Sequence, residues 1–444
     1  MRKYILFIIV SALFYSSYGS NVIALPYSTT DIVYSKIHGK LYALIDAMEP
    51  EYGNRLIEIN ITTGAVERNL FVGSQPFLIK LSSDENYAWI SFEGIPFVKR
   101  IDLNTFEIVK EIYLGPSKQH YEPNHRQSTV FAYNFAIFPN DNNTIALGLK
   151  TPFLFDFEAL SLYRNDTMLP IKLVDSNLIN GYYPFCFEPV LNGDFLIGHW
   201  QSSSESVYST IKVHDNGLEF LKEDITLNQM TPLSSNWFKV HNDTLYTAVG
   251  EIIGATDTSD LKELGIIENN IMGYTYGYTF SDIHNSFVYP NIHNNSLYLT
   301  FYNKNTFKAF DSAYLFEYPF YQYIFIQEIE VIDKNRFAIL MGKDGEYFTT
   351  YIIETNTSGI EPIQTNNNPE IFPNPATHSI FINGYPDNKK IRVYDITGNL
   401  IETIEHSGIS AEIDMSNYQP GLYLIKISDI EGKYNSVVKK IVLQ

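Results

Sequence analysis

A polar turn followed by an apolar strand recurs seven times along the 444-residue chain. In the clearest copy, the turn Ser82–Asn86 leads into the alternating aromatic and aliphatic strand Tyr87–Ile90. Ser and Asp side chains satisfy backbone groups in such turns, and aromatic and β-branched residues suit the pleated surface of a strand. The first strand residues of the seven copies are Leu41, Tyr87, Ile145, Phe195, Leu245, Leu297 and Phe337. The steps between them are 46, 58, 50, 50, 52 and 40 residues, a loose period that is typical of a β-propeller.

The repeat predicts an all-β protein in which residues 28–363 form a seven-bladed β-propeller of four-stranded blades. The composition agrees with this prediction, because 15% of the residues are aromatic and only 18% are charged. Tyr and Phe, which number 33 and 30, favour strands over helices.

The first two units can also be aligned outside the turn. The segment Ile57–Gly64 lies over Lys99–Phe106, 42 residues later, and in each an alternating strand ends in a polar turn. The Arg100–Thr105 run, with Leu81–Asp84 before it, resembles the repeats of YVTN-like and WD40-like extracellular β-propellers. That resemblance implies the fold and leaves the function open.

The N-terminal residues have the pattern of a secretory signal peptide, which we place at residues 1–19. Met1–Lys3 is positively charged, Tyr4–Tyr15 is apolar, and Ser17–Gly19 offers small residues for cleavage. The apolar segment is too short to span a membrane, and no later window reaches about 18 apolar residues, so we expect no transmembrane segment in the mature protein.

The net charge and the cysteine content argue against two classes of function, nucleic-acid binding and cysteine-dependent catalysis. The formal net charge is −19 and the chain has no basic patch with interleaved aromatic residues, so we expect no nucleic-acid ligand. The acidity is best explained by solubility. The single cysteine, Cys186, lies between two phenylalanines and is expected to be a buried core residue rather than a nucleophile.

The last part of the chain differs in composition from the rest. A polar linker at 364–369 precedes residues 370–444, which carry nine acidic and seven basic residues. Short strands are expected at Ser379–Ile382, on both sides of the turn at Gly398, at Leu422–Ile427 and at Lys439–Leu443. Their order and spacing, opened by Phe372–Ala376, resemble the type A C-terminal sorting domain of the type IX secretion system. The resemblance implies an immunoglobulin-like β-sandwich, the type IX machinery as a partner, and a secreted or outer-surface location reached through the periplasm.

Aromatic and polar residues gather in the segments that come just before the first strand of successive blades. In a propeller these segments meet on one face around the channel mouth, and rigidly held loops often carry binding function. Tyr and Trp offer flat contact area with a polar handle to a sugar or a peptide, although packing between blades would explain each ring equally well. The predicted ligand-binding residues are His120, Tyr121, Arg126, Tyr182, Tyr183, Trp237, Tyr276, Tyr278 and Tyr321.

Two functions fit this sequence, and the first is favoured. It is an exported binding module for a protein, a peptide or a glycan. The alternative is an extracellular hydrolase or lyase that acts on a polymer at the channel mouth. We identify no catalytic residues, because no Ser/His/Asp order can be defended from spacing, and we expect no cofactor or metal. The turns at Asp141 and Asp333 lack the alternating ligands of a calcium loop.

Overall fold

The structure is a computed structural model, and two compact units are distinguished in it, Met1–Ile360 and Glu361–Gln444. The predicted signal peptide and the linker at 364–369 lie outside the described residues. The structure describes residues 21–116, 129–139, 141–151, 157–174, 186–201, 206–226, 238–247, 250–256, 261–267, 277–293, 296–317, 324–343, 348–355, 370–383, 388–396, 399–407, 411–429 and 437–444.

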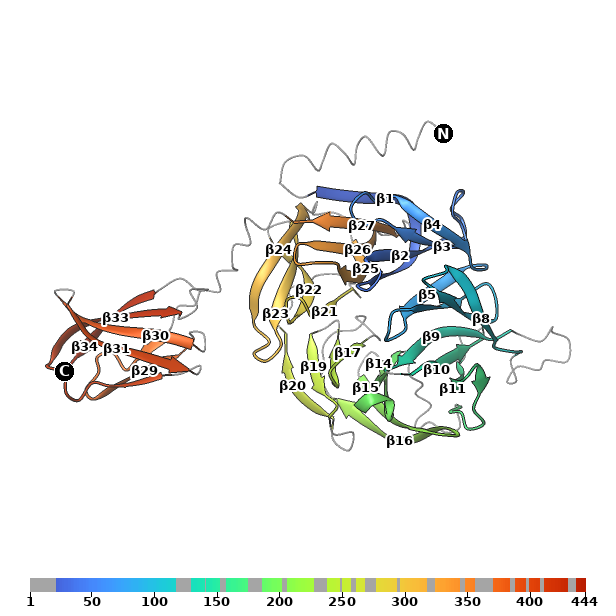
Figure 1. Cartoon of the computed structure of the whole chain (residues 1–444). Coiled ribbons are helices and arrows are strands. Elements are labelled where there is room, and N and C mark those ends of the chain that lie inside the picture. The colour runs from blue at the N-terminus through green and yellow to red at the C-terminus, as the bar shows by residue number, and fades with distance from the viewer. Residues whose placement is uncertain are drawn as a thin grey trace. The chain divides into compact units, whose positions relative to one another are not determined.

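The first unit consists of antiparallel sheets arranged around a central axis (Figure 1). Its first strands in chain order are β1 (Asn21–Ser35), β2 (Lys40–Ile45), β3 (Arg55–Ile59), β4 (Val66–Phe71), β5 (Pro76–Leu81), β6 (Tyr87–Phe92), β7 (Phe97–Asp102), β8 (Glu107–Tyr113), β9 (Phe131–Phe138), β10 (Asp141–Lys150), β11 (Phe157–Arg164) and β12 (Thr167–Met168). The next strands are β13 (Cys186–Val190), β14 (Phe195–Gln201), β15 (Ser206–His214), β16 (Gly217–Thr226), β17 (Phe238–His241), β18 (Thr244–Thr247), β19 (Glu251–Gly254) and β20 (Lys262–Ile266), with the 3-10 helix η3 (Leu191–Gly193) between β13 and β14. The last are β21 (Thr279–Ser281), β22 (Ser286–His293), β23 (Ser296–Asn303), β24 (Ala309–Glu317), β25 (Ile324–Val331), β26 (Arg336–Lys343) and β27 (Thr349–Glu354).

Strand β1 belongs to two sheets and joins the beginning of the unit to its end. Its first half pairs with β27, from Asn21 opposite Glu354 to Ala24 opposite Tyr351. After a register shift, its second half pairs with β2. Counted in this way, the described strands form seven four-stranded sheets, which supports the predicted seven-blade ring. The ring strand begins at Asn21, seven residues before the predicted boundary at residue 28.

Six of the seven strand positions that define the sequence repeat fall in the second strand of a sheet, in β2, β6, β10, β14, β18 and β26. The remaining one, Leu297, falls in β23, the third strand of its sheet. These strands are largely buried, as in β2 and β6, where every residue after the first is inaccessible to solvent. Strands that are covered on both faces need continuous apolar sequences, whereas the fourth strands β4 and β8 are mostly exposed. The repeat was therefore visible because it marks a well-buried inner strand of each sheet.

The turn that opens this repeat has the predicted side-chain chemistry. Ser82 Oγ donates to Asp84 Oδ1 at 2.6 Å, and the backbone N–H of Asn86 donates to the same carboxylate oxygen at 3.1 Å. Burial alone would raise the pKa of Asp84, but these bonds and one from Asn142 lower it. Because Asn142 belongs to the neighbouring sheet, the turn also fastens two sheets together.

The second unit is a two-layer sandwich. One layer has the order β28 (Glu370–Phe372), β29 (Ser379–Asn383) and β32 (Ala411–Asp414). The other has the order β31 (Leu400–Ser407), β30 (Asn388–Asp395), β33 (Gly421–Asp429) and β34 (Val437–Leu443). Ile380 and Ile413 of the first layer share one buried cluster with Ile391, Ile425 and Ile441 of the second. The immunoglobulin-like assignment within this sandwich stays a prediction.

Candidate functional site

Eight of the nine predicted ligand-binding residues lie outside the described residues. These are His120, Tyr121, Arg126, Tyr182, Tyr183, Trp237, Tyr276 and Tyr321. The ninth, Tyr278, is buried, with 1% of its surface exposed. Its ring stacks on Tyr289 with centroids 5.2 Å apart and meets Tyr246 edge-on at 5.6 Å.

Tyr278 is therefore a core residue rather than a ring that faces a ligand. It comes immediately before β21, and at that point its side chain already packs against the neighbouring strands. Burial raises the pKa of its hydroxyl well above the ordinary value. A position just before a first strand can thus be enclosed by its own sheet, and the sequence does not distinguish that case from an exposed link.

Ionisable side chains gather where the first strands of the sheets meet. The first strands β1, β5, β9 and β13 contact one another in turn, as do β13 and β17, β21 and β25, and β25 and β1, and Figure 1 shows β5, β17, β21 and β25 toward the middle of the ring. We name the acidic and lysine residues on these strands the axial charge cluster. Its members are Asp31, Lys80, Glu188, Lys239, Glu328 and Glu330.

Two ion pairs in this cluster join sheets that are not neighbours. Lys80 Nζ on β5 lies 2.6 Å from Glu188 Oε1 on β13, which bypasses the sheet that begins with β9. Lys239 on β17 pairs with Glu328 on β25, which bypasses the sheet that begins with β21. The four side chains keep between 19% and 33% of their surface exposed. They are partly shielded from water and still open to solvent.

The remaining acids of the cluster bind backbone groups. Asp31 Oδ2 accepts the N–H of Ile79 on the next sheet at 2.8 Å, and its Oδ1 accepts the N–H of Ile32 at 2.9 Å. Burial and the charge of Glu328 nevertheless raise the pKa of Asp31 to about 8, against the pull of these amides and of Lys239. Burial and Glu328 also raise the pKa of Glu330. Both carboxyls therefore hold protons near neutral pH.

Lys239 is the positive centre of this group. Burial alone would lower the pKa of its ammonium, but Glu328 and Glu330 outweigh that effect and raise it. Its Nζ also lies 5.8 Å from the centroid of the Tyr278 ring. In the other ion pair of the cluster, Lys80 Nζ lies 5.6 Å from the centroid of the Phe135 ring. Aromatic faces stabilise a partly desolvated cation, so each lysine is held by a carboxylate and a ring.

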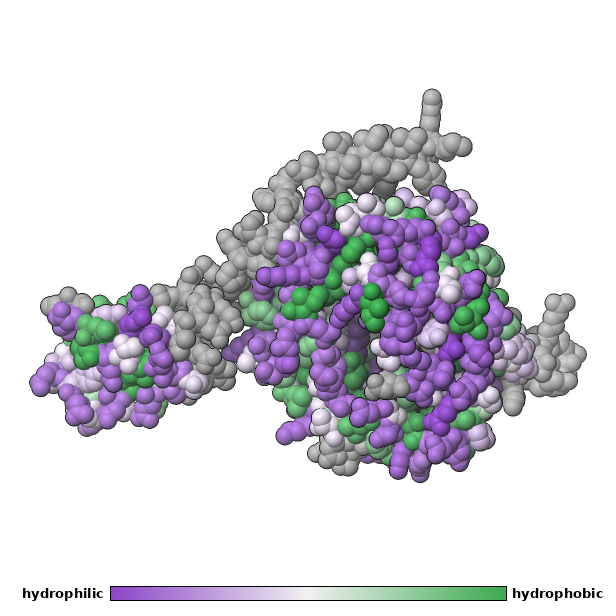
Figure 2. All heavy atoms as spheres, in the orientation of Figure 1, coloured by the Kyte–Doolittle hydropathy of each residue, from purple (hydrophilic) through white to green (hydrophobic). Residues whose placement is uncertain are grey.

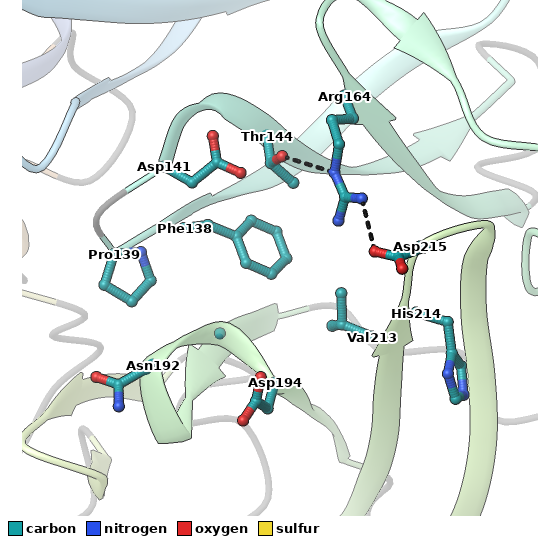
Figure 3. Close-up of a pocket in the computed structure, with 11 residues that line it drawn as sticks. Phe138, Pro139, Asp141, Thr144, Arg164, Asn192, Asp194, Val213, His214 and Asp215 are labelled. Carbon is teal, nitrogen blue, oxygen red and sulfur yellow. Dashed lines mark hydrogen bonds and ion pairs between the residues drawn. The ribbon is translucent and has the colours of Figure 1, made fainter.

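A cleft of about 360 Å³ lies between two neighbouring sheets, at the ends of their strands (Figure 3). Its lining residues are Phe138, Pro139, Asp141, Thr144, Arg164, Asn192, Gly193, Asp194, Val213, His214 and Asp215. The Arg164 guanidinium donates to Thr144 Oγ1 at 3.3 Å and, across the cleft, to Asp215 Oδ1 at 3.2 Å. Among the residues that the structure describes, no group of three His, Cys, Asp or Glu side chains is placed to hold a metal ion.

Cys186 has the buried position that the sequence predicts. Its Sγ donates to the carbonyl of Phe238 at 3.3 Å and accepts the N–H of the same residue at 3.4 Å. Burial raises the pKa of the thiol to about 12, so it stays protonated and joins β13 to β17.

Sequence reasoning missed the axial charge cluster because its members look like isolated irregularities in core strands. Glu328 and Glu330 interrupt the apolar strand Ile324–Val331, and Lys239 follows Phe238 directly. A charge at the same place in several first strands is the signal that could have revealed the cluster. To recognise this signal, one must already know which strand comes first in each sheet of the propeller.

The surface of the propeller shows no single large apolar face in the view of Figure 2. Hydrophilic residues dominate there, and the hydrophobic areas are small and separated. Exposed apolar residues such as Ile37, Phe71 and Tyr113 come from different turns and strands, and apolar residues scattered in this way are normal on a protein surface. Among the described residues, no helix is long and apolar enough to cross a membrane.

The sheets, their pairing and their central axis define the first unit as a β-propeller, and a solved structure agrees. The chain is similar to the β-propeller domain of Cps50 (Swd1) from Myceliophteria thermophila in its crystal structure, with a TM-score of 0.52 and 12% identity. The match covers 76% of this chain and 100% of that one. At this identity the likeness concerns the fold alone, and it confirms the predicted propeller. No curated protein matches the sequence.

The second unit gives the more specific result. Residues 370–444 match the family described as the secretion system C-terminal sorting domain. This confirms the predicted type IX sorting domain, and it marks the chain as a protein that the type IX system secretes to the cell surface or the extracellular space. The type IX machinery is accordingly a partner of this domain.

Proposed function

We propose that the propeller is a non-catalytic extracellular binding module for a protein, a peptide or a glycan. Its binding face is formed by the segments that precede the first strands, as the sequence predicts. The observation that carries the proposal is the cluster itself, in which six ionisable side chains from five sheets meet where the first strands converge.

Stability alone does not call for such a cluster. Replacing a shielded ion pair by apolar side chains of similar volume is often neutral or stabilising, because desolvation of the charges is costly. Four members of the cluster remain partly exposed, and two carboxyls hold protons that an approaching charge can displace. Clustered ionisable groups with displaced pKa values are typical of functional sites.

The alternative, a hydrolase or lyase, has one observation in its favour. The charge of Glu328 contributes to raising the pKa of Glu330, and an ionised and a protonated carboxyl in one site can act as base and acid. Against it, both oxygens of Asp31 accept backbone N–H groups, and Glu328 is paired with Lys239. These carboxyls are already bound to backbone amides and to a lysine, so binding is the better proposal.

The binding face can be tested by removing its predicted aromatic residues. The full mature chain would be titrated by surface plasmon resonance against peptides and polysaccharides that retain it on an array. Changing Tyr182, Trp237 and Tyr276 to Ala should weaken binding at least tenfold, because each stacked ring contributes on the order of 1–2 kcal/mol. Tyr113→Ala is the control, since Tyr113 is exposed on the outer strand β8. Unchanged affinity in the triple variant would refute this binding face.

A further inference from the structure

The cleft between the sheets β9–β12 and β13–β16 lies away from the proposed binding face. It is formed by turns within the sheets: the β9–β10 turn, the end of β11, the β13–β14 turn and the end of β15. These turns lie at the opposite strand ends from the segments that connect one sheet to the next. A ligand in the cleft would therefore occupy a separate site.

On the side of the propeller that carries the cleft, the two neighbouring pairs of adjacent sheets are joined by direct contacts between their corresponding turns. Asp84 Oδ2 accepts a bond from Asn142 Nδ2 at 2.7 Å at one junction, and the N–H of Leu191 donates to Asp243 Oδ1 at 2.6 Å at another. At the junction between them, the Arg164–Asp215 pair and backbone hydrogen bonds of Ile171 with Asn216 and Leu218 span part of the gap, and a cleft remains beside the Arg164–Asp215 pair. Its volume lies within the range of about 300–1,000 Å³ that is usual for small-molecule sites.

The local chain geometry fixes the apolar part of the cleft. Gly193 has a φ of 93°, and a Cβ at that position would lie 2.7 Å from Phe138 Cδ1. The backbone of the β13–β14 turn can therefore approach the Phe138 ring only because residue 193 is glycine. Phe138 and Val213 point toward the interior of the cleft in Figure 3.

The polar groups around this apolar part carry both charge signs. Asp141, Asp194 and Asp215 supply carboxylates, Arg164 supplies a guanidinium that pairs with Asp215, and Asn192 supplies an amide that both donates and accepts. An anion would meet the three carboxylates, and a cation would meet the guanidinium. A purely apolar ligand would remove all of them from water without replacing their hydrogen bonds, which is costly.

We propose that this cleft binds a neutral saccharide unit of a glycan. A sugar hydroxyl both donates and accepts hydrogen bonds, so it can pair with a carboxylate and a guanidinium at once. The C–H face of a sugar ring is apolar and fits against the half-buried Val213 and the 4% of the Phe138 surface that stays exposed. Asp194 is exposed, which leaves its carboxylate available to the ligand.

The test uses the full mature chain and saturation-transfer NMR with three neutral trisaccharides, maltotriose, mannotriose and galactotriose, as probes. At least one should bind the wild type. Asp194→Ala should weaken that binding at least fivefold, and Asp194→Trp, which fills the cleft, should abolish it. Asp282→Ala is the matched control, because Asp282 is an exposed acid on the β21–β22 turn, and it should bind as the wild type does.

Three results would overturn the proposal. The first is that none of the trisaccharides binds. The second is equal binding by wild type and Asp194→Trp, which places the sugar elsewhere. The third is retention of a lysine-rich pentapeptide in place of the sugars, which identifies the cleft as a site for basic side chains. The Asp194 variants should lose sugar binding and keep their affinity for ligands of the proposed binding face. This result would show that the cleft and the proposed binding face are independent sites.

Discussion

Replacing Lys239 by Met should lower the free energy of unfolding of the propeller by about 2–3 kcal/mol at neutral pH. Met keeps the aliphatic length of the side chain and removes its charge. Glu328 then loses its partner beside Glu330 and Asp31, whose pKa values are raised by burial and by the charge of Glu328. A fully buried pair would cost more, but Lys239 and Glu328 keep 33% and 19% of their surface exposed, so solvent screens part of the loss.

Equilibrium urea unfolding of the full chain measures this effect, and a second variant identifies its cause. Lys36→Met removes a pair with Asp282 in which both side chains are more than half exposed, and it should change stability by less than about 1 kcal/mol. Adding Glu328→Gln to Lys239→Met should restore most of the loss, because the unpaired carboxylate is then absent. If Lys239→Met is no more destabilising than Lys36→Met, the axial pair does not support the ring.

The stability of the propeller should fall as the pH rises from 6.5 to 8.5. The pKa of Asp31 is 3.8 in its ordinary state and about 8 in the fold, and the pKa of Glu330 is also raised. Between these values the folded chain keeps protons that the unfolded chain has released. Linkage then requires stability to decrease with pH up to the folded pKa and to level off above it. Each carboxyl changes stability by at most about 1.4 kcal/mol per pH unit, and we expect a total fall of about 2 kcal/mol.

The pH window is chosen to exclude other titrations. His241 and His284 have pKa values lowered by burial, so their contribution grows with pH and is complete above the ordinary histidine value. Glu67 and Asp84 have lowered pKa values and act only at acidic pH. The Asp31→Asn and Glu330→Gln double variant, compared at the same pH values by urea unfolding, should show a nearly flat profile. A wild-type profile that is flat or rises, or a double variant with the wild-type slope, contradicts the assignment.

The sequence predicted the propeller because the most regular strands are also the most buried. Tyr87 and Ile145 belong to second strands that need apolar residues on both faces, and polar turns precede them, so the repeat stands out. The pairing of Asn21–Ala24 with β27 could not be predicted. It depends on two segments more than 300 residues apart, and nothing local marks Asn21 as the edge of the last sheet.

The candidate site was less accessible to sequence reasoning, for two different physical reasons. Tyr278 was predicted to face a ligand, but a ring beside a first strand is buried when the neighbouring strands close over it. Lys239 and Glu328 were not singled out, because their partnership exists only after the ring closes and brings β17 near β25. Likewise, the cleft at Asp194 arises from the spacing of two turns, which neither turn encodes alone.

The sorting domain and the propeller constrain function at different levels. The match at residues 370–444 establishes export, whereas the fold alone is compatible with binding and with catalysis. The axial charge cluster favours binding, because its carboxyls are already engaged with lysines and backbone amides. A binding module leaves its ligand chemically unchanged, whereas a hydrolase or lyase cleaves it. The two functions can therefore be distinguished by analysing the ligand after incubation with the protein.

The most direct measurement is to incubate the full mature chain with each polymer or peptide that retains it, and then to determine the mass distribution of that ligand by mass spectrometry. If the propeller is a binding module, retention is saturable and the ligand is recovered with its mass unchanged, even after long incubation with stoichiometric protein. Shortened chains or new reaction products that disappear in the Glu328→Gln and Glu330→Gln variants would establish an enzyme instead.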